Sequence, residues 1–246
     1  MSGTNAQSPF SRTAALLGDE AMQRLHKARV AVFGVGGVGG YAVEALVRSG
    51  VGTVDVFDKD DVSITNLNRQ IIALHSTVGQ DKVSVIAARM RDINPDVIIH
   101  EHKMFYLPEN ADEIDLAAYD FVVDAVDTVA AKIELALRCE RLGVPLIAAM
   151  GAGNKLDPSK LQISDIYKTS VCPLARAMRT ALRKKGVKHL TVVYSTEEPV
   201  RPAEAIATEG PNPTGSRKDV PASAAFVPSA MGLLIASHVV RTLTGK

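Results

Sequence analysis

A glycine-rich turn separates an apolar run from an amphipathic segment near the start of the chain. The run covers residues 29–34, the turn reads Gly-Val-Gly-Gly-Val-Gly, and the amphipathic segment covers residues 41–49. Glycines permit a tight turn and close approach of the backbone to a ligand, and the start of the next helix offers free N–H groups to a phosphate. The pattern predicts a nucleotide site. Its glycines are Gly34, Gly36, Gly37 and Gly39.

An acidic residue follows at the spacing expected for ribose recognition. Asp58 ends the next apolar run, residues 53–58, about 20 residues beyond the turn, where a carboxylate can accept bonds from ribose hydroxyls. This much of the pattern suits a nicotinamide or flavin dinucleotide as well as ATP. A third interpretation is that the glycines serve only the packing of strand and helix.

The residues after Asp58 favour a triphosphate. Asn66, Arg69 and Gln70 are spaced about one helical turn apart, so they can share a face, and Lys82 begins the next helical segment. A dinucleotide carries two phosphate charges, which a helix start can largely satisfy. A triphosphate carries about four and usually recruits Arg, Lys and a divalent metal. Arg69 and Lys82 supply that additional positive charge, which favours ATP.

One carboxylate is placed to hold a metal ion. Asp127 lies just beyond the apolar run 121–124, at the carboxyl edge of the expected sheet, where it can bind magnesium through one carboxylate. Ordinary alternatives exist for single residues: Asp127 as a helix cap and Lys82 as a solvated helix residue. The prediction of an ATP site would fail only if every one of these residues had its ordinary structural role instead.

The elements that position these residues alternate between strand and helix. Short β-branched runs alternate with helix-length segments, which predicts an α/β fold: a Rossmann-like, doubly wound, mainly parallel sheet. Strands are expected at 29–34, 53–58, 97–100, 121–124 and 146–149. Helices are expected at 41–49, 82–93 and 129–142.

The pattern changes after residue 155 and predicts a C-terminal α+β extension. We expect strands at 161–165 and 191–195, helices at 173–185 and 229–243, and a mobile surface loop near 199–221. The chain is then a single unit, 1–246, in which residues 1–155 form the ATP-binding core. Residues 156–246 are expected to bind substrate and to mediate dimerisation.

Charge is balanced overall but not locally. The 246 residues carry 28 basic and 27 acidic side chains, so the whole chain is no polyanion binder, and 46% hydrophobic residues exclude global disorder. Residues 166–196 contain no acid and seven basic residues. A solvated helix face is the ordinary interpretation, but the complete absence of acids favours contacts with an RNA backbone. The candidates are Arg176, Arg179, Arg183, Lys184 and Lys185.

The cysteine content and the apolar runs of the sequence indicate the cellular compartment in which the protein is expected. Cys139 and Cys172 are the only cysteines, too few for a disulfide scaffold or a four-thiolate zinc site. Residues 1–12 lack the apolar run of a signal peptide, so we expect a cytoplasmic protein. Residues 221–240 carry no Lys, Arg, Asp or Glu, yet they include Pro and Ser, which favours a buried helix at a subunit interface over a membrane span.

With these motifs the sequence resembles the ubiquitin-activating-enzyme-like (ThiF, MoeB and HesA) adenylyltransferases. The resemblance implies binding of ATP and Mg²⁺ and adenylation of a carboxylate. It implies that Asp127 holds the metal and that Arg12, near the N-terminus, reaches the partner's site in a homodimer. Arg12, Arg69, Lys82 and Asp127 form the implied catalytic set. The implied ATP ligands, besides the glycines, are Asp58, Asp60, Asn66, Arg69, Gln70 and Lys82.

Within that superfamily the sequence is most similar to the tRNA threonylcarbamoyladenosine dehydratases. The matching segments include 12–18, 151–153, 194–197 and 209–211, so the resemblance covers nearly the whole chain. It implies ATP-dependent closure of a threonylcarbamoyl side chain into a ring beside a tRNA anticodon, and a sulfur-transfer protein as a further partner. The chain lacks the paired Cys-x-x-Cys motifs of sulfur-carrier activators, so no zinc is expected.

Several alternatives stay open at this point. The first is an adenylyltransferase that activates the C-terminal glycine of a ubiquitin-like sulfur carrier. The others are a non-catalytic nucleotide-sensing module and a dinucleotide oxidoreductase. Cys172, which precedes an expected helix, is the candidate for a thiol that accepts the acyl group, whereas Cys139 is expected in the core.

Overall fold

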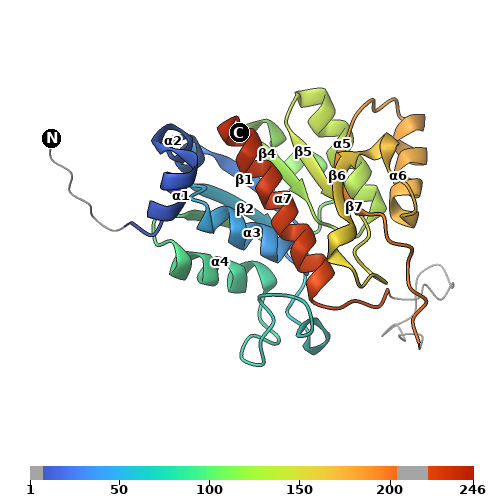
Figure 1. Cartoon of the computed structure of the whole chain (residues 1–246), viewed down its shortest axis with the longest axis horizontal. Helices are drawn as coiled ribbons and strands as arrows, with labels where there is room; N and C mark the ends of the chain where they lie inside the picture. The colour runs from blue at the N-terminus through green and yellow to red at the C-terminus, as the bar shows by residue number, and fades with distance from the viewer. Residues whose placement is uncertain (1–7, 204–220) are drawn as a thin grey trace, which may run out of the picture.

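The computed structural model describes residues 8–203 and 221–246 and shows one sheet covered by helices on both faces (Figure 1). The order across the sheet is β3-β2-β1-β4-β5-β7-β6, and all neighbours are parallel except β6 and β7. This confirms the doubly wound α/β fold with its C-terminal extension, whose strand β7 joins the same sheet. The strands are β1 Arg29–Phe33, β2 Thr53–Phe57, β3 Ile98–His102, β4 Phe121–Asp124, β5 Leu146–Ala149, β6 Leu161–Asp165 and β7 Thr191–Ser195.

The helices divide between the two faces of the sheet. Side chains of α3, α4 and α7 share one apolar core with Val30, Val32 and Val54, whereas α5 packs on the opposite face against Ala31 and Phe33. Strands buried on both faces explain the nearly continuous apolar runs of the sequence. The helices of the described residues are α1 Ser11–Leu17, α2 Asp19–Lys27, α3 Gly39–Arg48, α4 Lys82–Ile93, α5 Val129–Leu142, α6 Pro173–Lys184 and α7 Phe226–Thr244.

The strand order reverses between β1 and β4. From β1 the chain proceeds to β2 and β3 on one side, and it returns to β4 and β5 on the other. In such sheets the loops that follow the two central strands separate and leave a crevice at the carboxyl edge. The glycine turn follows β1 and Asp127 follows β4, so the topology brings these two segments to the same crevice.

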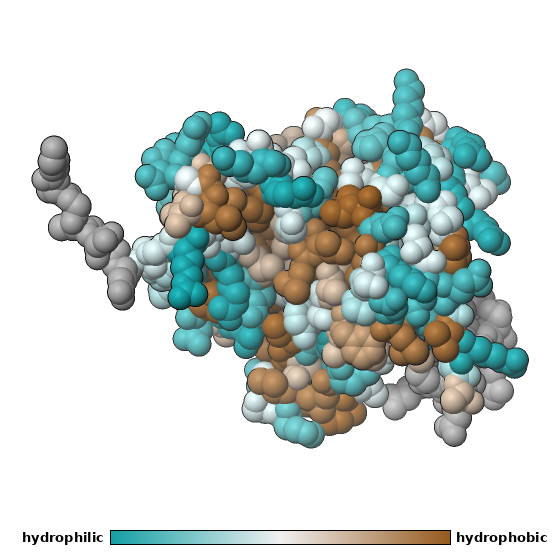
Figure 2. Space-filling model, viewed as in Figure 1, coloured by the Kyte–Doolittle hydropathy of each residue, from teal (hydrophilic) through white to brown (hydrophobic). Residues whose placement is uncertain are grey.

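Helix α7 packs against α3 and the sheet. Val227, Met231, Ile235 and Val239 are buried at helical spacing, and Gly232 allows close contact because a Cβ there would lie 2.9 Å from Cβ of Tyr41. Among the described residues α7 alone is long and apolar enough to meet the criteria for a membrane span. Apolar residues also gather on its outer side (Figure 2), where Leu233 is 52% exposed.

A few elements differ from the sequence prediction. Strand β3 covers 98–102 rather than 97–100, and α7 begins at Phe226 rather than at residue 229. Helices α1 and α2 were not predicted; α1 buries no residue and α2 buries only Ala21 and Leu25, so the two helices add little to the core. The predicted mobile loop, 199–221, lies largely outside the described residues, which exclude 204–220.

A buried ion pair supports the end of β4. Nζ of Lys132, on α5, lies 2.9 Å from Oδ1 of Asp124, and both side chains are fully buried. The same oxygen accepts a bond from N–H of Val126. Burial raises the pKa of Asp124, and the ammonium group of Lys132 opposes that shift. The pair thereby fixes the turn that leads to Asp127.

We predict that Lys132→Met lowers the free energy of unfolding by about 3 kcal/mol, because it leaves a buried carboxylate without its partner. Without Lys132 the pKa of Asp124 is raised further above its unfolded value. The variant should therefore lose stability as pH rises from the pKa of Asp124 in the unfolded chain towards its raised pKa in the folded chain. The difference in free energy of unfolding between wild type and variant should be larger at pH 7 than at pH 5. Urea denaturation at both pH values measures this. Equal deficits, or a deficit that the second change Asp124→Leu does not reduce, would contradict the prediction.

Candidate nucleotide site

Two of the four glycines are required by the fold of the turn itself. Gly34 has φ of +85°, and a Cβ there would lie 2.7 Å from the carbonyl oxygen of Ala125. A Cβ at Gly39 would overlap the carbonyl oxygen of Gly34. Gly36 and Gly37 have more room: the nearest atoms to an added Cβ are Nε2 of Gln70 at 3.5 Å and Cβ of Pro228 at 3.4 Å. Gly36 and Gly37 therefore border the space that a ligand needs.

The first turn of α3 has no cap. The helix begins at Gly39 with Val38 in the N-cap position, no side chain accepts a cap bond, and its first turn holds no acid. Helix starts leave N–H groups without intrahelical partners, and the helix dipole is positive there. The turn thus presents donors of the kind that bind phosphate.

Asp58, Asp60 and Lys82 form a small charged group beside the turn. Oδ2 of Asp58 accepts from N–H of Val35 at 2.9 Å, so the carboxylate is fastened to the glycine turn. Nζ of Lys82 lies 3.2 Å from Oδ2 of Asp60 and 4.0 Å from Oδ1 of Asp58, and Lys82 is only 6% exposed. Each carboxylate oxygen keeps a free lone pair for a ribose hydroxyl.

Arg69 is a half-buried cation without an acidic partner in the described residues. Its Nη1 donates to two neutral oxygens, the carbonyl of Thr65 at 2.9 Å and Oδ1 of Asn68 at 2.8 Å. Burial lowers the pKa of Arg69, and no carboxylate offsets that effect. Its stem lies against the glycine turn, since Cγ is 3.5 Å from the position of a Cβ on Gly37. An anion at the turn would supply the missing negative charge.

Gln70 and Asn66 border the same turn. Oε1 of Gln70 is buried and has no hydrogen-bond partner among the described residues, although its amide nitrogen faces Gly36. Such orphaned atoms are uncommon in folded proteins and fit a site that a ligand completes. Asn66 is buried, and its Oδ1 accepts from N–H of Ser63 as part of a capping box. Only its amide nitrogen is left for a phosphate.

Asp127 fits a magnesium ligand. Its carboxylate is exposed just beyond β4, and its recorded bond is a long one, 3.3 Å, from the hydroxyl of Thr128. No cation among the described residues lies within ion-pair distance of it. The neighbouring Ala125 touches Gly34, so Asp127 lies at the phosphate side of the crevice. Magnesium is commonly held by one or two carboxylates together with phosphate oxygens, which suits this position.

Arg12 lies at the opposite edge of the sheet. It is exposed on α1, and the adjoining Phe10 lies 3.7 Å from the position of a Cβ on Gly50, just before β2. The strands thus separate Arg12 from the glycine turn of its own chain. The structure brings together the other predicted nucleotide-site residues and leaves Arg12 apart.

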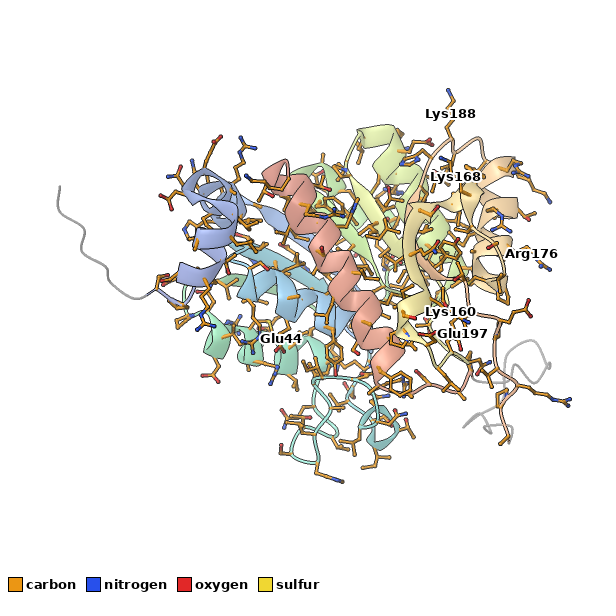
Figure 3. All side chains as sticks on the ribbon, in the orientation of Figure 1. Glu44, Lys160, Lys168, Arg176, Lys188 and Glu197 are labelled. Carbon is orange, nitrogen blue, oxygen red and sulfur yellow. The ribbon has the colours of Figure 1, made fainter. Side chains whose placement is uncertain are left out.

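The basic residues of α6 do not form one equivalent set. Nη1 of Arg179 donates to the carbonyl of Thr169 and contacts its hydroxyl, and the guanidinium of Arg183 lies 5.4 Å from the ring centre of Tyr167. Arg183 is exposed, and so are the other three, which border a shallow hollow of about 570 Å³ along the helix and its C-terminal end: Arg176, Lys184 and Lys185. Figure 3 shows Lys168, Arg176 and Lys188 on the same flank of the molecule.

Neither cysteine offers an accessible thiol. Cys172 is 1% exposed within an apolar cluster, close to Gly151, and Cys139 is 1% exposed on α5. Cys139 thus lies in the core, as expected, and this burial raises the pKa of its thiol to about 12. Nε2 of His102 lies 3.1 Å from Asp55, and the described residues contain no cluster that could hold a metal through three His, Cys, Asp or Glu side chains.

The sequence prediction missed two residues that support the site. Lys132 stands on the apolar face of α5 with Leu135 and Cys139, and a lysine in such a position signals a buried acidic partner. Asn68 lies inside the motif 66–70, but its two bonds, to Arg69 and to the carbonyl of Ser223, depend on tertiary contacts that spacing alone does not reveal.

Three comparisons with known proteins agree with this geometry. The chain is 47% identical to a tRNA threonylcarbamoyladenosine dehydratase of Bacillus subtilis over 95% of this chain and 94% of that protein. A crystal structure of the Escherichia coli dehydratase TcdA in complex with ATP superposes with a TM-score of 0.86 at 35% identity, covering 96% and 94% of the two chains. A Thermus thermophilus sulfur carrier protein adenylyltransferase is 37% identical, but over only 53% of this chain and 48% of that protein. The model of the ThiF family matches residues 10–246, and the chain therefore belongs to the ThiF family.

Proposed function

We propose that the chain is an ATP-dependent tRNA threonylcarbamoyladenosine dehydratase. The observation that carries this proposal is the extent of the similarity. The match to the Bacillus subtilis dehydratase includes the C-terminal part, whereas the match to a sulfur-carrier adenylyltransferase covers about half of the chain. Activation of a sulfur carrier is the second candidate, because it needs the same nucleotide site.

The reaction needs an activated acid. A carboxylate is a poor electrophile, since its leaving group would be oxide. Attack of the threonine carboxylate on the α-phosphorus of ATP gives an acyl adenylate and releases pyrophosphate. The carbamoyl group, already tethered to the same side chain, then attacks the acyl carbon and displaces AMP. Loss of one water overall closes the ring.

The site residues serve the phosphates and the ribose. Arg69, Lys82 and the start of α3 stabilise negative charge that builds on the phosphate oxygens. Asp58 binds the ribose, and the other ATP contacts come from Asp60, Asn66, Gln70 and the glycine turn. Asp127 holds magnesium, which when bound neutralises phosphate charge and orients the polyphosphate.

Ring closure requires no nucleophile from the protein. Holding two tethered groups in a reactive geometry supplies roughly 7–11 kcal/mol in well-oriented cases. The burial of Cys172 supports this route over transfer of the acyl group to a thiol. The chain's task in this step is to hold the substrate and exclude competing water.

The basic flank of α6 is the proposed tRNA contact. The helix begins at Pro173 beside Gly151, near the carboxyl edge of the sheet, and runs toward the amino edge. Its 12 residues span roughly 18 Å, so Arg176 lies near the end at Gly151, and Lys184 and Lys185 lie at the other end. We accordingly assign ATP binding to residues 1–155 and tRNA binding and dimerisation to 156–246.

We further propose a cytoplasmic homodimer. The exposed apolar side of α7, with Phe226 and Leu233, supports a subunit contact. The position of Arg12 at the far edge of its own sheet is consistent with a role in the partner's site. A sulfur-transfer protein remains a proposed additional partner.

The proposed reaction predicts a defined mass change. Threonylcarbamoylated tRNA incubated with the protein, ATP and Mg²⁺ should lose the mass of one water, measured by mass spectrometry of the released nucleosides. Lys82→Ala and Asp127→Ala should each abolish this turnover and leave the circular dichroism spectrum unchanged. An unchanged tRNA, with adenylation of a sulfur carrier's C-terminal glycine instead, would establish the second candidate.

Two glycines provide a matched pair of variants. Gly36→Ala should change the free energy of unfolding by less than about 1 kcal/mol, since its Cβ meets only ordinary contacts, yet it should weaken ATP binding because it occupies the ligand's space. Gly39→Ala should destabilise the fold by at least about 2 kcal/mol, because its Cβ overlaps backbone. Thermal unfolding and calorimetry with ATP separate the effects. If a folded Gly36→Ala variant binds ATP with normal affinity, the glycine turn is not part of the ATP site.

The exposed cations of α6 predict a change in salt dependence. Combined Ala substitutions at Arg176, Lys184 and Lys185 should weaken tRNA binding. They should also reduce the slope of log affinity against log salt by about one unit per lost phosphate contact. Lys27→Ala on α2 is the control and should leave the slope unchanged. If the triple variant keeps the original slope, tRNA docks on another surface.

A further inference from the structure

Asn68 connects the cation of the nucleotide site to a distant part of the chain. Its Oδ1 accepts from Nη1 of Arg69 at 2.8 Å, and its Nδ2 donates to the carbonyl of Ser223 at 2.9 Å. An amide satisfies both neighbours at once because it carries an acceptor and a donor on one rigid plane. Neither a carboxylate nor an apolar side chain can replace it in both bonds.

Among the described residues, these bonds leave one edge of the Arg69 guanidinium available. Nη1 carries two hydrogens, and the carbonyl of Thr65 and Oδ1 of Asn68 accept both. The Nε–H group and Nη2 lie along the other edge of the planar fork. That edge offers two parallel N–H donors, the arrangement that binds two phosphate oxygens together. Because the stem of Arg69 lies against Gly37, this edge is set close to the glycine turn.

The segment that Asn68 contacts is itself held in place. Oδ1 of Asn154 accepts from N–H of Ala222 at 2.8 Å, and N–H of Asn154 donates to the carbonyl of Ala222 at 2.7 Å. A few residues later Pro228, on α7, borders Gly37. Asn68 thus ties Arg69 to a segment fixed on both sides rather than to a mobile side chain.

We infer that Asn68 is a positioning residue that directs the Nε–Nη2 edge of Arg69 at a phosphate of ATP. A flexible arginine has to be ordered when its ligand binds, and that ordering costs affinity. Asn68 orders the guanidinium beforehand. The inference rests on the proposed function, since it requires that Arg69 binds ATP.

A double-mutant cycle tests the coupling. Calorimetry with ATP and Mg²⁺ would compare the wild type, Asn68→Ala, Arg69→Met and the double variant. Arg69→Met should weaken binding by about 10- to 100-fold, the range expected for loss of charged hydrogen bonds. Asn68→Ala should weaken it by about 5-fold, the effect expected when one long side chain must be ordered on binding. The double variant should bind like Arg69→Met alone, because Asn68 acts only through Arg69.

Further variants separate positioning from general destabilisation. Asn68→Asp should bind ATP more weakly than Asn68→Ala, since a carboxylate would pair with Arg69 and compete with phosphate. Asn110→Ala is the matched control: its amide also bridges two backbone groups, those of Leu107 and Phe105, but away from the turn. It should lower the melting temperature and leave ATP affinity unchanged. In turnover assays Asn68→Ala should raise KM for ATP and leave KM for tRNA unchanged.

The outcomes distinguish two kinds of failure. If Arg69→Met binds ATP normally, the proposed role of Arg69 in the nucleotide site is wrong. If Arg69→Met weakens binding but the effects of Asn68→Ala and Arg69→Met simply multiply in the double variant, the site stands and the positioning role of Asn68 is overturned. A loss of ATP affinity in Asn110→Ala equal to that in Asn68→Ala would also overturn it.

Discussion

The site depends on a half-buried guanidinium, that of Arg69, which has no carboxylate beside it in residues 8–203 and 221–246. Taking a cation partly out of water is unfavourable unless negative charge or strong acceptors surround it. Arg69 has two neutral oxygens, from Thr65 and Asn68, and it lies against a glycine turn whose helix start is also positive. Two positive features that face the same space repel each other. A polyphosphate bound between them would replace this repulsion with attraction. The repulsion is present in the folded protein before ATP binds, so its relief favours ATP binding.

Several other partly or fully buried cations have an acidic partner, whereas Arg179, like Arg69, donates only to neutral oxygens among the described residues. Arg29 forms two bonds with Asp55, Arg89 binds Glu44, and Lys132 binds Asp124. Each of these cations has an acid in its immediate surroundings, so each is satisfied by the protein alone. Lys82 is intermediate, since it is nearly buried between Asp58 and Asp60 yet borders the same turn. What distinguishes Arg69 is that its stem lies against the glycine turn, where an anion can reach it.

Sequence reasoning reached the elements and most of the site for physical reasons. The segments 82–93, 121–124 and 129–142 were predicted with the observed bounds because their apolar periodicity and their Gly, Pro and Asn ends are local signals. The crevice followed from the rule that ligands bind where strand order reverses. Arg179 shows the limit: its spacing placed it with Arg176, but its Nη1 also donates to the carbonyl of Thr169, a bond that the spacing does not reveal. Which hydrogen bonds a cation forms is decided by tertiary neighbours, and spacing does not contain them.

The same limit explains why Asn68 escaped notice while Arg69 did not. The positive charge of Arg69 within a nucleotide motif predicts a phosphate contact from sequence alone. The neighbouring amide of Asn68 could have many other roles, so its type predicts no particular one. Its importance emerges only when Ser223, more than 150 residues away, is found at the other end of the same side chain. The segment before α7 is therefore coupled to the phosphate side of the site through one amide plane. This hydrogen bond joins the nucleotide motif to the C-terminal part of the chain, 156–246, for which we propose a role in tRNA binding.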